Sequence, residues 1–177
     1  LGVSFFTLTE GMDDGDLVDQ AMFDLLSEED ISDALRKAND EVAAMLDRFA
    51  SRWLAGDVAK YPQPELAPSY CGLRTPEDGR INWHHSAGAV HNFIRAQARP
   101  YPGAYTFLAN GGALRIWRAA IEPREFFGVP GSVVEVATDA IVVACGTGAI
   151  RIPMAQMSSE DPVTLLSSLR SLKVRFR

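Results

Sequence analysis

An acidic turn bracketed by glycines constrains the fold of this chain more than any other feature of its sequence. Residues 3–8 form an apolar, strand-like run, residues 10–16 read EGMDDGD, and a second apolar run follows. Glycine and aspartate favour turns, because glycine adopts positive φ without steric cost and aspartate bonds to nearby backbone. The pattern therefore predicts two strands joined by a tight loop that carries Asp13 between Gly11 and Gly15.

A long amphipathic helix is predicted behind this loop. Residues 2–9 and 16–25 are expected to be the two strands. Ser27 is the expected N-cap, since a serine oxygen accepts hydrogen bonds from first-turn amides, and Gly56 is expected at the C-terminal end. Two strands are too few to cover the apolar stripe of this helix, which indicates that further strands lie outside the chain. The stripe recurs at helical spacing, at Ile31, Ala34, Leu35, Ala38, Val42, Met45, Leu46, Phe49 and Trp53.

The second half of the chain has the pattern of a small β domain. Residues 60–68 contain three prolines and predict a semi-rigid linker, and a shorter helix is expected over residues 86–98. Five short strands separated by tight turns fit a small Greek-key barrel of the OB type. A last short helix is expected to begin at residues 159–162. The expected strands are residues 104–108, 113–118, 132–137, 140–145 and 149–154, with Asn110-Gly111 as the first hairpin turn.

Composition indicates a folded protein whose charge is unevenly divided. The hydrophobic share is 47% and the charged share 23%, and no uncharged apolar run approaches membrane-spanning length. Residues 1–69 hold 15 acidic and 5 basic side chains, whereas residues 70–177 hold 8 acidic and 12 basic ones. The asymmetry indicates two units with different surroundings, and the basic excess is too small to demand nucleic acid. Cys71 and Cys145 provide no disulfide framework, which favours a reduced, cytosolic protein.

Several stretches carry a resemblance to a known family. They are the acidic loop, the sequence RTPEDGRINW over residues 74–83, HNFIRA over residues 91–96 and RPYPGA over residues 99–104. The loop resembles the catalytic aspartate loop of the formyltransferases that use 10-formyltetrahydrofolate. The later stretches resemble the hinge and early C-terminal domain of the methionyl-tRNA formyltransferases and their amino-sugar-nucleotide relatives. The resemblance runs from residue 2 to about residue 152.

This resemblance implies an α/β chain in three parts. Residues 1–58 would be the C-terminal part of a Rossmann-like formyltransferase domain, residues 59–73 a proline-rich linker, and residues 74–177 a C-terminal domain with a helix and an OB-like barrel. In that family an Asn-x-His motif in front of a Ser-Leu-Leu-Pro turn precedes the loop, and we expect no match to it in this chain. We therefore expect the chain to be part of a longer cytoplasmic enzyme, inactive without its N-terminal half.

The resemblance also assigns the chemistry to a few positions. Formyl transfer from 10-formyltetrahydrofolate to a primary amine passes through a tetrahedral intermediate, which needs an oxyanion donor and a base. Asp13 matches the aspartate that orients the catalytic histidine and raises its pKa, because a nearby carboxylate favours imidazolium. Gly11, Met12, Asp14 and Gly15 would bind the folate, mainly through backbone groups. The acceptor would be an amino-sugar nucleotide or initiator methionyl-tRNA, and no metal is expected.

Other interpretations stay open at these positions. Asp13 can instead be a solvated turn residue, while a calcium loop lacks the glutamate that an EF-hand requires at its twelfth position. Arg74 is placed either to bind a phosphate or carboxylate of a substrate, or to form a salt bridge with Glu77 or Asp78. The rival function is a non-catalytic OB-type binding module derived from a formyltransferase.

The remaining reactive and aromatic side chains favour structural roles. His84, His85 and His91 with Cys71 match no common zinc spacing. Residues 146–148 read GTG, too short for a phosphate-binding fingerprint and without a helix behind it, so a turn is predicted. Aromatic residues at strand-like spacing could stack nucleic-acid bases but are more often core, namely Trp83, Trp117, Tyr101 and Tyr105.

Overall fold

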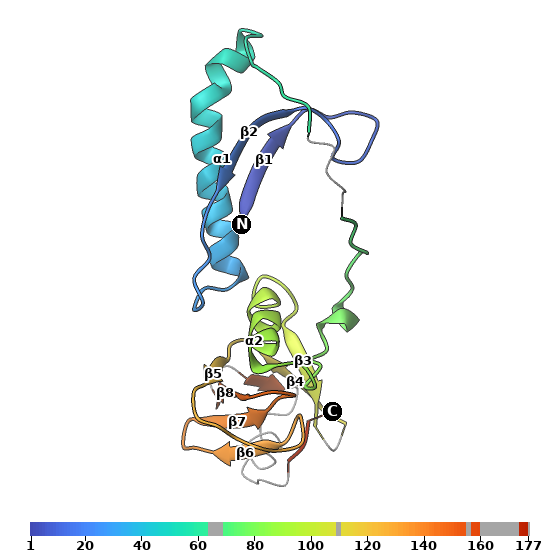
Figure 1. Ribbon diagram of the computed structural model, residues 1–177, viewed down its shortest axis with the longest axis vertical. Coiled ribbons are helices and arrows are strands. Elements are labelled where there is room, and N and C mark those ends of the chain that lie inside the picture. The colour runs from blue at the N-terminus through green and yellow to red at the C-terminus, as the bar shows by residue number, and fades with distance from the viewer. Residues whose placement is uncertain (64–68, 109–110, 155–156, 160–173, 177) are drawn as a thin grey trace. The chain divides into compact units, whose positions relative to one another are not determined.

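The computed structural model of the chain describes residues 1–63, 69–108, 111–154, 157–159 and 174–176 (Figure 1). The chain forms two compact units, Leu1–Leu73 and Arg74–Arg177. Both units combine helix with antiparallel strands, which confirms the predicted α/β class. None of the described helices is both long and apolar enough to cross a membrane.

The first unit is a β-hairpin with a long helix packed against it. Strand β1 (Gly2–Phe6) pairs antiparallel with β2 (Leu17–Met22), and helix α1 (Ile31–Leu54) contacts both strands. The ring of Phe5 on β1 meets the ring of Phe49 on α1 edge to face, with centroids 5.1 Å apart. The predicted hairpin and amphipathic helix are thus confirmed, because one face of α1 packs on the sheet.

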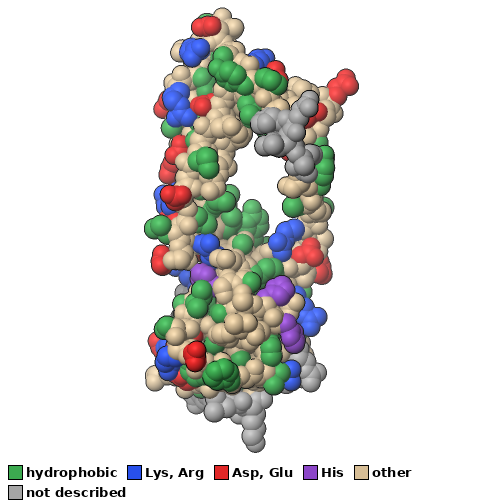
Figure 2. Space-filling view, in the orientation of Figure 1, with side chains coloured by type: hydrophobic (Ala, Val, Ile, Leu, Met, Phe, Trp, Pro, Cys, Tyr) green, Lys and Arg blue, Asp and Glu red, His purple; other side chains and the backbone are tan. Residues whose placement is uncertain are grey.

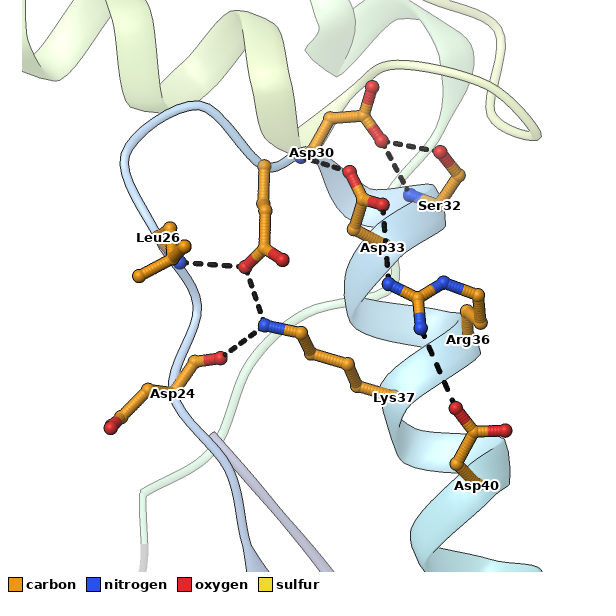
Figure 3. Close-up of polar contacts among 9 residues, drawn as sticks. Asp24, Leu26, Asp30, Ser32, Asp33, Arg36, Lys37 and Asp40 are labelled. Carbon is orange, nitrogen blue, oxygen red and sulfur yellow. Dashed lines mark hydrogen bonds and ion pairs between the residues drawn. The ribbon is translucent and has the colours of Figure 1, made fainter.

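Helix α1 begins at a different capping residue from the one expected. Asp30, not Ser27, is the N-cap: its carboxylate accepts from the backbone N–H of Ser32 at 2.9 Å (Figure 3). The carboxylate of Asp33 accepts in return from the N–H of Asp30 at 3.3 Å. Ser27 lies in the preceding turn, where its hydroxyl donates to Glu28 at 2.6 Å. The prediction failed because serine and aspartate are equally good N-caps, and the sequence offered both.

The chain returns to the hairpin after α1. Gly56 has a φ of 72°, the left-handed conformation that glycine favours directly after a helix, as predicted. Tyr61 then forms an antiparallel bridge with Leu17. The N–H of Leu17 donates to the Tyr61 carbonyl at 2.7 Å, and the N–H of Tyr61 donates to the Leu17 carbonyl at 2.9 Å. The segment that follows α1 is therefore fixed beside the start of β2.

The second unit contains two antiparallel sheets and a helix. One sheet has the strand order β3-β4-β9, and the other has the order β5-β8-β7-β6. Helix α2 (Ala87–Ala96) begins at Ser86, whose hydroxyl accepts from the N–H of Ala89, and η1 (Pro76–Gly79) is a short 3-10 helix. The strands are β3 (Ala104–Phe107), β4 (Ala113–Ile116), β5 (Ala120–Glu122), β6 (Val133–Val136), β7 (Ala140–Ala144), β8 (Ala149–Pro153) and β9 (Met157–Ser159).

An arginine joins the two edge strands of the four-stranded sheet. The guanidinium of Arg124 donates to Glu122 of β5 at 2.8 and 3.1 Å and pairs with Glu135 of β6 at 2.9 Å. Neighbouring strands lie about 4.8 Å apart, so the edges of a flat four-stranded sheet would be roughly 14 Å apart. The ion pair between the long side chains of Arg124 and Glu135 therefore links the two edges of the sheet. Among the described residues, however, the ladders form two sheets and none closes them into a barrel.

The core of the second unit lies between helix α2 and the sheets. Trp83 is 4% exposed; its indole N–H donates to the hydroxyl of Thr106 at 3.0 Å, and its ring stacks on Phe176 with centroids 5.5 Å apart. The structural role favoured for Trp83 is therefore confirmed. Fully burying a large apolar side chain stabilises a fold by about 1.5–3 kcal/mol. The largest fully buried apolar residues here are Ile94, Leu114, Ile116, Ile141, Ile150 and Ile152.

Two strands of the second unit escaped the sequence analysis. The predicted hairpin β3–β4, the hairpin β6–β7, strand β8 and helix α2 are confirmed, and the turn at residues 146–148 links β7 to β8. Strands β5 and β9 have only three residues each, too few to show an alternating pattern. The helix predicted to begin at residues 159–162 falls almost wholly outside the described residues, as do the turn residue Asn110 and residues 64–68 of the proline-rich linker.

Candidate functional site

Hydrogen bonds between the two ends of the acidic loop close it between β1 and β2. The hydroxyl of Thr9 donates to the Asp14 carboxylate, and the N–H of Thr7 donates to the Asp16 carbonyl at 2.9 Å. Gly15 is buried at this closure, and a Cβ there would come closer than 3.0 Å to the carbonyl oxygen of Thr7. The close approach of the two chain segments therefore requires glycine at this position.

The tip of the loop is open to solvent. Gly11 is exposed, and the carboxylate of Asp14 occupies the space where a side chain at Gly11 would begin. Met12 at the tip is 88% exposed. The tip thus offers an apolar side chain and bare backbone side by side, which suits contact with a flat heteroaromatic ring.

Asp13 carries an exposed carboxylate at the tip of the loop. Its φ is 55°, a region that non-glycine residues rarely adopt and in which aspartate is enriched. The residue is exposed, and within the described part of the chain its carboxylate has no hydrogen-bond partner. The neighbouring Asp14 differs, since its carboxylate is bonded to Thr9. The two adjacent aspartates therefore differ: Asp14 closes the loop, and Asp13 leaves its carboxylate exposed.

Gln63 reaches the same loop from a distant part of the sequence. Its side-chain Nε2 donates to the carbonyl of Asp13 at 2.7 Å and to the carbonyl of Gly15 at 2.9 Å. Sequence analysis missed this residue, because it lies among prolines in a segment interpreted only as a linker. The two hydrogen bonds join residues that are 50 and 48 positions apart in the sequence, and no local sequence pattern predicts contacts over such a separation.

Arg74 is held by its own segment at the start of the second unit. Its Nη2 donates to the backbone carbonyl of Asp78 at 3.2 Å, and its guanidinium lies 5.8 Å from the ring centroid of Phe93. The carboxylate of Asp78 instead accepts from the N–H of Thr75 at 2.8 Å. Among the described residues Arg74 thus bonds backbone and no carboxylate, so the predicted salt bridge does not form. Its side chain stays exposed, and the substrate-binding role remains a prediction.

An Asn-x-His sequence does occur in the second unit, although sequence analysis found no counterpart of the family motif. Asn82, Trp83 and His84 have this spacing, but they form a structural turn ahead of α2. The side-chain oxygen of Asn82 accepts from the N–H of His84 at 3.1 Å, and Trp83 lies in the core. Within the described part of the chain, no three His, Cys, Asp or Glu side chains gather as a metal site would require.

Comparison with known proteins decides the family. The sequence model described as "Formyl transferase, C-terminal domain" matches residues 74–173, more than half of the chain. The chain belongs to this formyltransferase family. The resemblance predicted from the sequence is therefore confirmed.

Solved structures show that this formyltransferase chain shares its fold with larger proteins. HypX from Aquifex aeolicus, in complex with tetrahydrofolic acid, is similar with a TM-score of 0.67 and 22% identity, over 90% of this chain and 27% of HypX. An N-formyltransferase from Helicobacter canadensis, in complex with folinic acid and dTDP-3-aminofucose, is similar with a TM-score of 0.65 and 17% identity, over 89% of this chain and 55% of its own. Methionyl-tRNA formyltransferase from Clostridium thermocellum is similar with a TM-score of 0.52 and 18% identity, over 71% of this chain and 53% of its own. The chain thus spans between about a quarter and about half of these proteins.

Proposed function

We propose that the protein transfers a formyl group from 10-formyltetrahydrofolate to a primary amine, with Asp13 as its catalytic carboxylate. The main support is the exposed Asp13 carboxylate, which has no partner among the described residues, at the tip of a loop in which the neighbouring Asp14 is bonded to Thr9 and the Asp13 carbonyl to Gln63. On this proposal residues 1–58 belong to the catalytic domain, residues 59–73 form the linker and residues 74–177 form the C-terminal domain.

The open tip of the loop supports a folate as formyl donor. The folate would supply the activated formyl carbon. Gly11, Met12, Asp14 and Gly15 would hold its ring, because the tip combines accessible backbone with the exposed Met12 side chain. Two proteins of the same fold have tetrahydrofolic acid or folinic acid bound. The donor set of the loop fits such a ring without a metal ligand, since ring edges bind to backbone donors and acceptors.

Asp13 would act through an imidazole that another part of the protein supplies. A carboxylate bonded to an imidazole N–H fixes the orientation of the ring and stabilises the imidazolium that forms when the ring takes a proton from the amine. An exposed carboxylate is suited to this role, because it can accept a hydrogen bond from a group outside its own loop.

We also propose that the rest of the catalytic domain, its N-terminal half, packs on an apolar groove of the first unit. This groove has a volume of about 410 Å³. Trp53 is 47% exposed and Leu54 is 88% exposed, and Figure 2 shows hydrophobic side chains at the surface of the unit. Exposed apolar surface of this kind marks a contact site. The groove is lined by Phe5, Phe6, Val18, Leu46, Phe49, Ala50, Trp53 and Leu54.

Two acceptors compete, an amino-sugar nucleotide and methionyl-tRNA. The fold matches the enzyme bound to dTDP-3-aminofucose over 89% of this chain, against 71% for the methionyl-tRNA enzyme. Coverage does not separate the two, because HypX matches over 90% of this chain, so both stay candidates for the assay below and we consider the amino-sugar nucleotide first. Arg74 would then bind a phosphate of the nucleotide, because a guanidinium offers two parallel donors to phosphate oxygens.

The test is single-turnover formyl transfer by the full-length protein to each acceptor, paired with an equilibrium folate titration. Asp13→Asn keeps the shape of the side chain and should slow transfer by about 10⁴-fold, as loss of a histidine-orienting aspartate does elsewhere. Folate affinity should stay within about threefold, because groups that bind substrate and transition state equally are untouched. Asp16→Asn, an exposed carboxylate at the end of the same loop, is the matched control and should leave the rate unchanged. If Asp13→Asn retains more than a tenth of the rate, a loss below about 1.4 kcal/mol, the assignment is wrong.

A further inference from the structure

We propose that Gln63 is a positioning residue for Asp13, and that its side-chain amide fixes the acidic loop in the shape that presents the Asp13 carboxylate. This inference rests on the proposed function of Asp13 in formyl transfer. It goes beyond that function because it assigns a role to a residue of the segment that leads out of the first unit.

The side-chain nitrogen of Gln63 donates both of its hydrogens. A carboxamide nitrogen carries two hydrogens, and here one goes to the carbonyl of Asp13 at 2.7 Å and the other to the carbonyl of Gly15 at 2.9 Å. These carbonyls lie on either side of Asp14. The single amide therefore fixes the orientation of the peptide groups both after Asp13 and after Gly15.

The backbone of Asp13 needs such support. At a φ of 55° the residue occupies a region that costs energy for any residue with a side chain, and such conformations persist only where the surroundings hold them. The direction of the Asp13 side chain follows from this backbone conformation. If the two hydrogen bonds from Gln63 are lost, the loop can relax to a more common conformation, and the carboxylate then points elsewhere.

Gln63 is itself anchored close to the loop. Two residues earlier, Tyr61 is tied to Leu17 by a pair of backbone hydrogen bonds of 2.7 and 2.9 Å, and Leu17 begins the strand that follows the loop. Pro62 between them has a restricted φ, which limits how far the chain can move from the bridge. The anchor therefore holds the Gln63 side chain at a fixed distance from its two carbonyl acceptors.

The experiment compares two glutamine substitutions in the full-length protein. Gln63→Met keeps the length of the side chain and removes both donors. Gln20→Met is the matched control, because the side-chain amide of Gln20 donates to the hydroxyl of Ser4 at 2.9 Å, between two exposed residues of the hairpin and away from the acidic loop. Misplacing a catalytic group by about 1 Å can cost about 10²-fold in rate. We expect Gln63→Met to lower the single-turnover rate of formyl transfer about 30-fold with folate affinity within threefold, and Gln20→Met to stay within twofold on both.

A double-mutant cycle separates positioning from general stabilisation. If Gln63 acts through Asp13, then Gln63→Met should cost less than about threefold when it is introduced into the Asp13→Asn protein, because the carboxylate that it positions is gone. A fall of tenfold or less in the otherwise native protein, or a fall of more than threefold in the Asp13→Asn background, overturns the proposal.

A second measurement keeps this proposal distinct from the proposed function. Exchange of the Thr7 amide, whose N–H donates to the Asp16 carbonyl at 2.9 Å and so reports opening of the loop, should accelerate at least about tenfold in Gln63→Met and not in Gln20→Met when followed by NMR, whether or not the protein is active. If Asp13→Asn transfers formyl groups at the native rate, the proposed function of Asp13 fails. Unchanged exchange in Gln63→Met shows instead that Gln63 does not hold the loop.

Discussion

Replacing Asp30 with alanine should destabilise the first unit by about 2 kcal/mol, because it removes the cap of its long helix. Asp30 is only 5% exposed, and its carboxylate accepts from both the backbone N–H and the hydroxyl of Ser32 (Figure 3). Alanine has no acceptor, so the N–H of Ser32 would lose its partner at the N-terminus of α1. The return bond from the N–H of Asp30 to Asp33 is longer, at 3.3 Å, and contributes less.

The magnitude combines three effects of different size. Substituting an N-cap by alanine costs about 0.5–2 kcal/mol, and a buried donor left without a partner costs about 1–3 kcal/mol. A negative charge beside a helix N-terminus contributes a further ~0.3–1 kcal/mol through the helix dipole. These three free energies cannot be added, because they partly describe the same hydrogen bond. The expected loss of stability therefore lies in the upper part of the capping range, at about 2 kcal/mol.

Two control variants test whether the cap, rather than the charge, is responsible. Asp30→Asn keeps an acceptor of equal capping quality and should cost well under ~1 kcal/mol. Asp40→Ala removes a carboxylate that lies 3.6 Å from Arg36 on the exposed face of the same helix. An exposed pair of this spacing contributes about 0.3–0.5 kcal/mol, and the higher helix propensity of alanine offsets it, so stability should be nearly unchanged.

Urea unfolding followed by far-ultraviolet circular dichroism measures this prediction, because α1 is the longest described helix, with 24 residues. The midpoint should fall for Asp30→Ala while the slope stays constant, as expected when stability changes and the unfolded state does not. A loss below ~0.5 kcal/mol for Asp30→Ala would refute the argument. An equal loss for Asp40→Ala would do so as well, since it would make the effect one of charge alone.

Three further predictions follow from single contacts. Gly15→Ala should destabilise the first unit by about 2 kcal/mol or more in the same urea assay, because its Cβ would collide with a facing backbone carbonyl; an unchanged midpoint would contradict this. The Arg124 guanidinium lowers the pKa of Glu122 below its ordinary value of 4.5. The pair therefore stabilises the fold above pH 4.5, and this stabilisation is lost as the pH falls through the lowered pKa. Acid unfolding of Glu122→Gln should accordingly show a weaker pH dependence in that range than unfolding of the native protein. Burial raises the pKa of the Cys145 thiol to about 11, so a thiol reagent at neutral pH should label the exposed Cys71 and reach Cys145 only after unfolding, which mass spectrometry can read.

The sequence predicted those features of the fold that depend on neighbouring residues. The hairpin around the acidic loop and the helix over residues 31–54 were predictable, because turn residues and apolar spacing act within one element. The true N-cap was not, since Ser27 and Asp30 compete on equal terms. Strands β5 and β9 depend on partners far along the chain, β8 and β4 respectively, and three residues cannot show such pairing. Sequence pattern specifies elements better than it specifies contacts between them.

The two adjacent aspartates of the loop show what this distinction means for the site. The glycines of the loop do not contact Asp13 in this way: Gly11 leaves room for the carboxylate of Asp14, and Gly15 leaves room for the carbonyl of Thr7, just after β1. The orientation of Asp13 depends instead on its left-handed backbone and on Gln63, a residue outside the motif. A protein with the same loop but without this glutamine should therefore keep the fold of the hairpin and lose the fixed presentation of its carboxylate. If the proposed chemistry is right, the motif alone is an incomplete description of the catalytic loop.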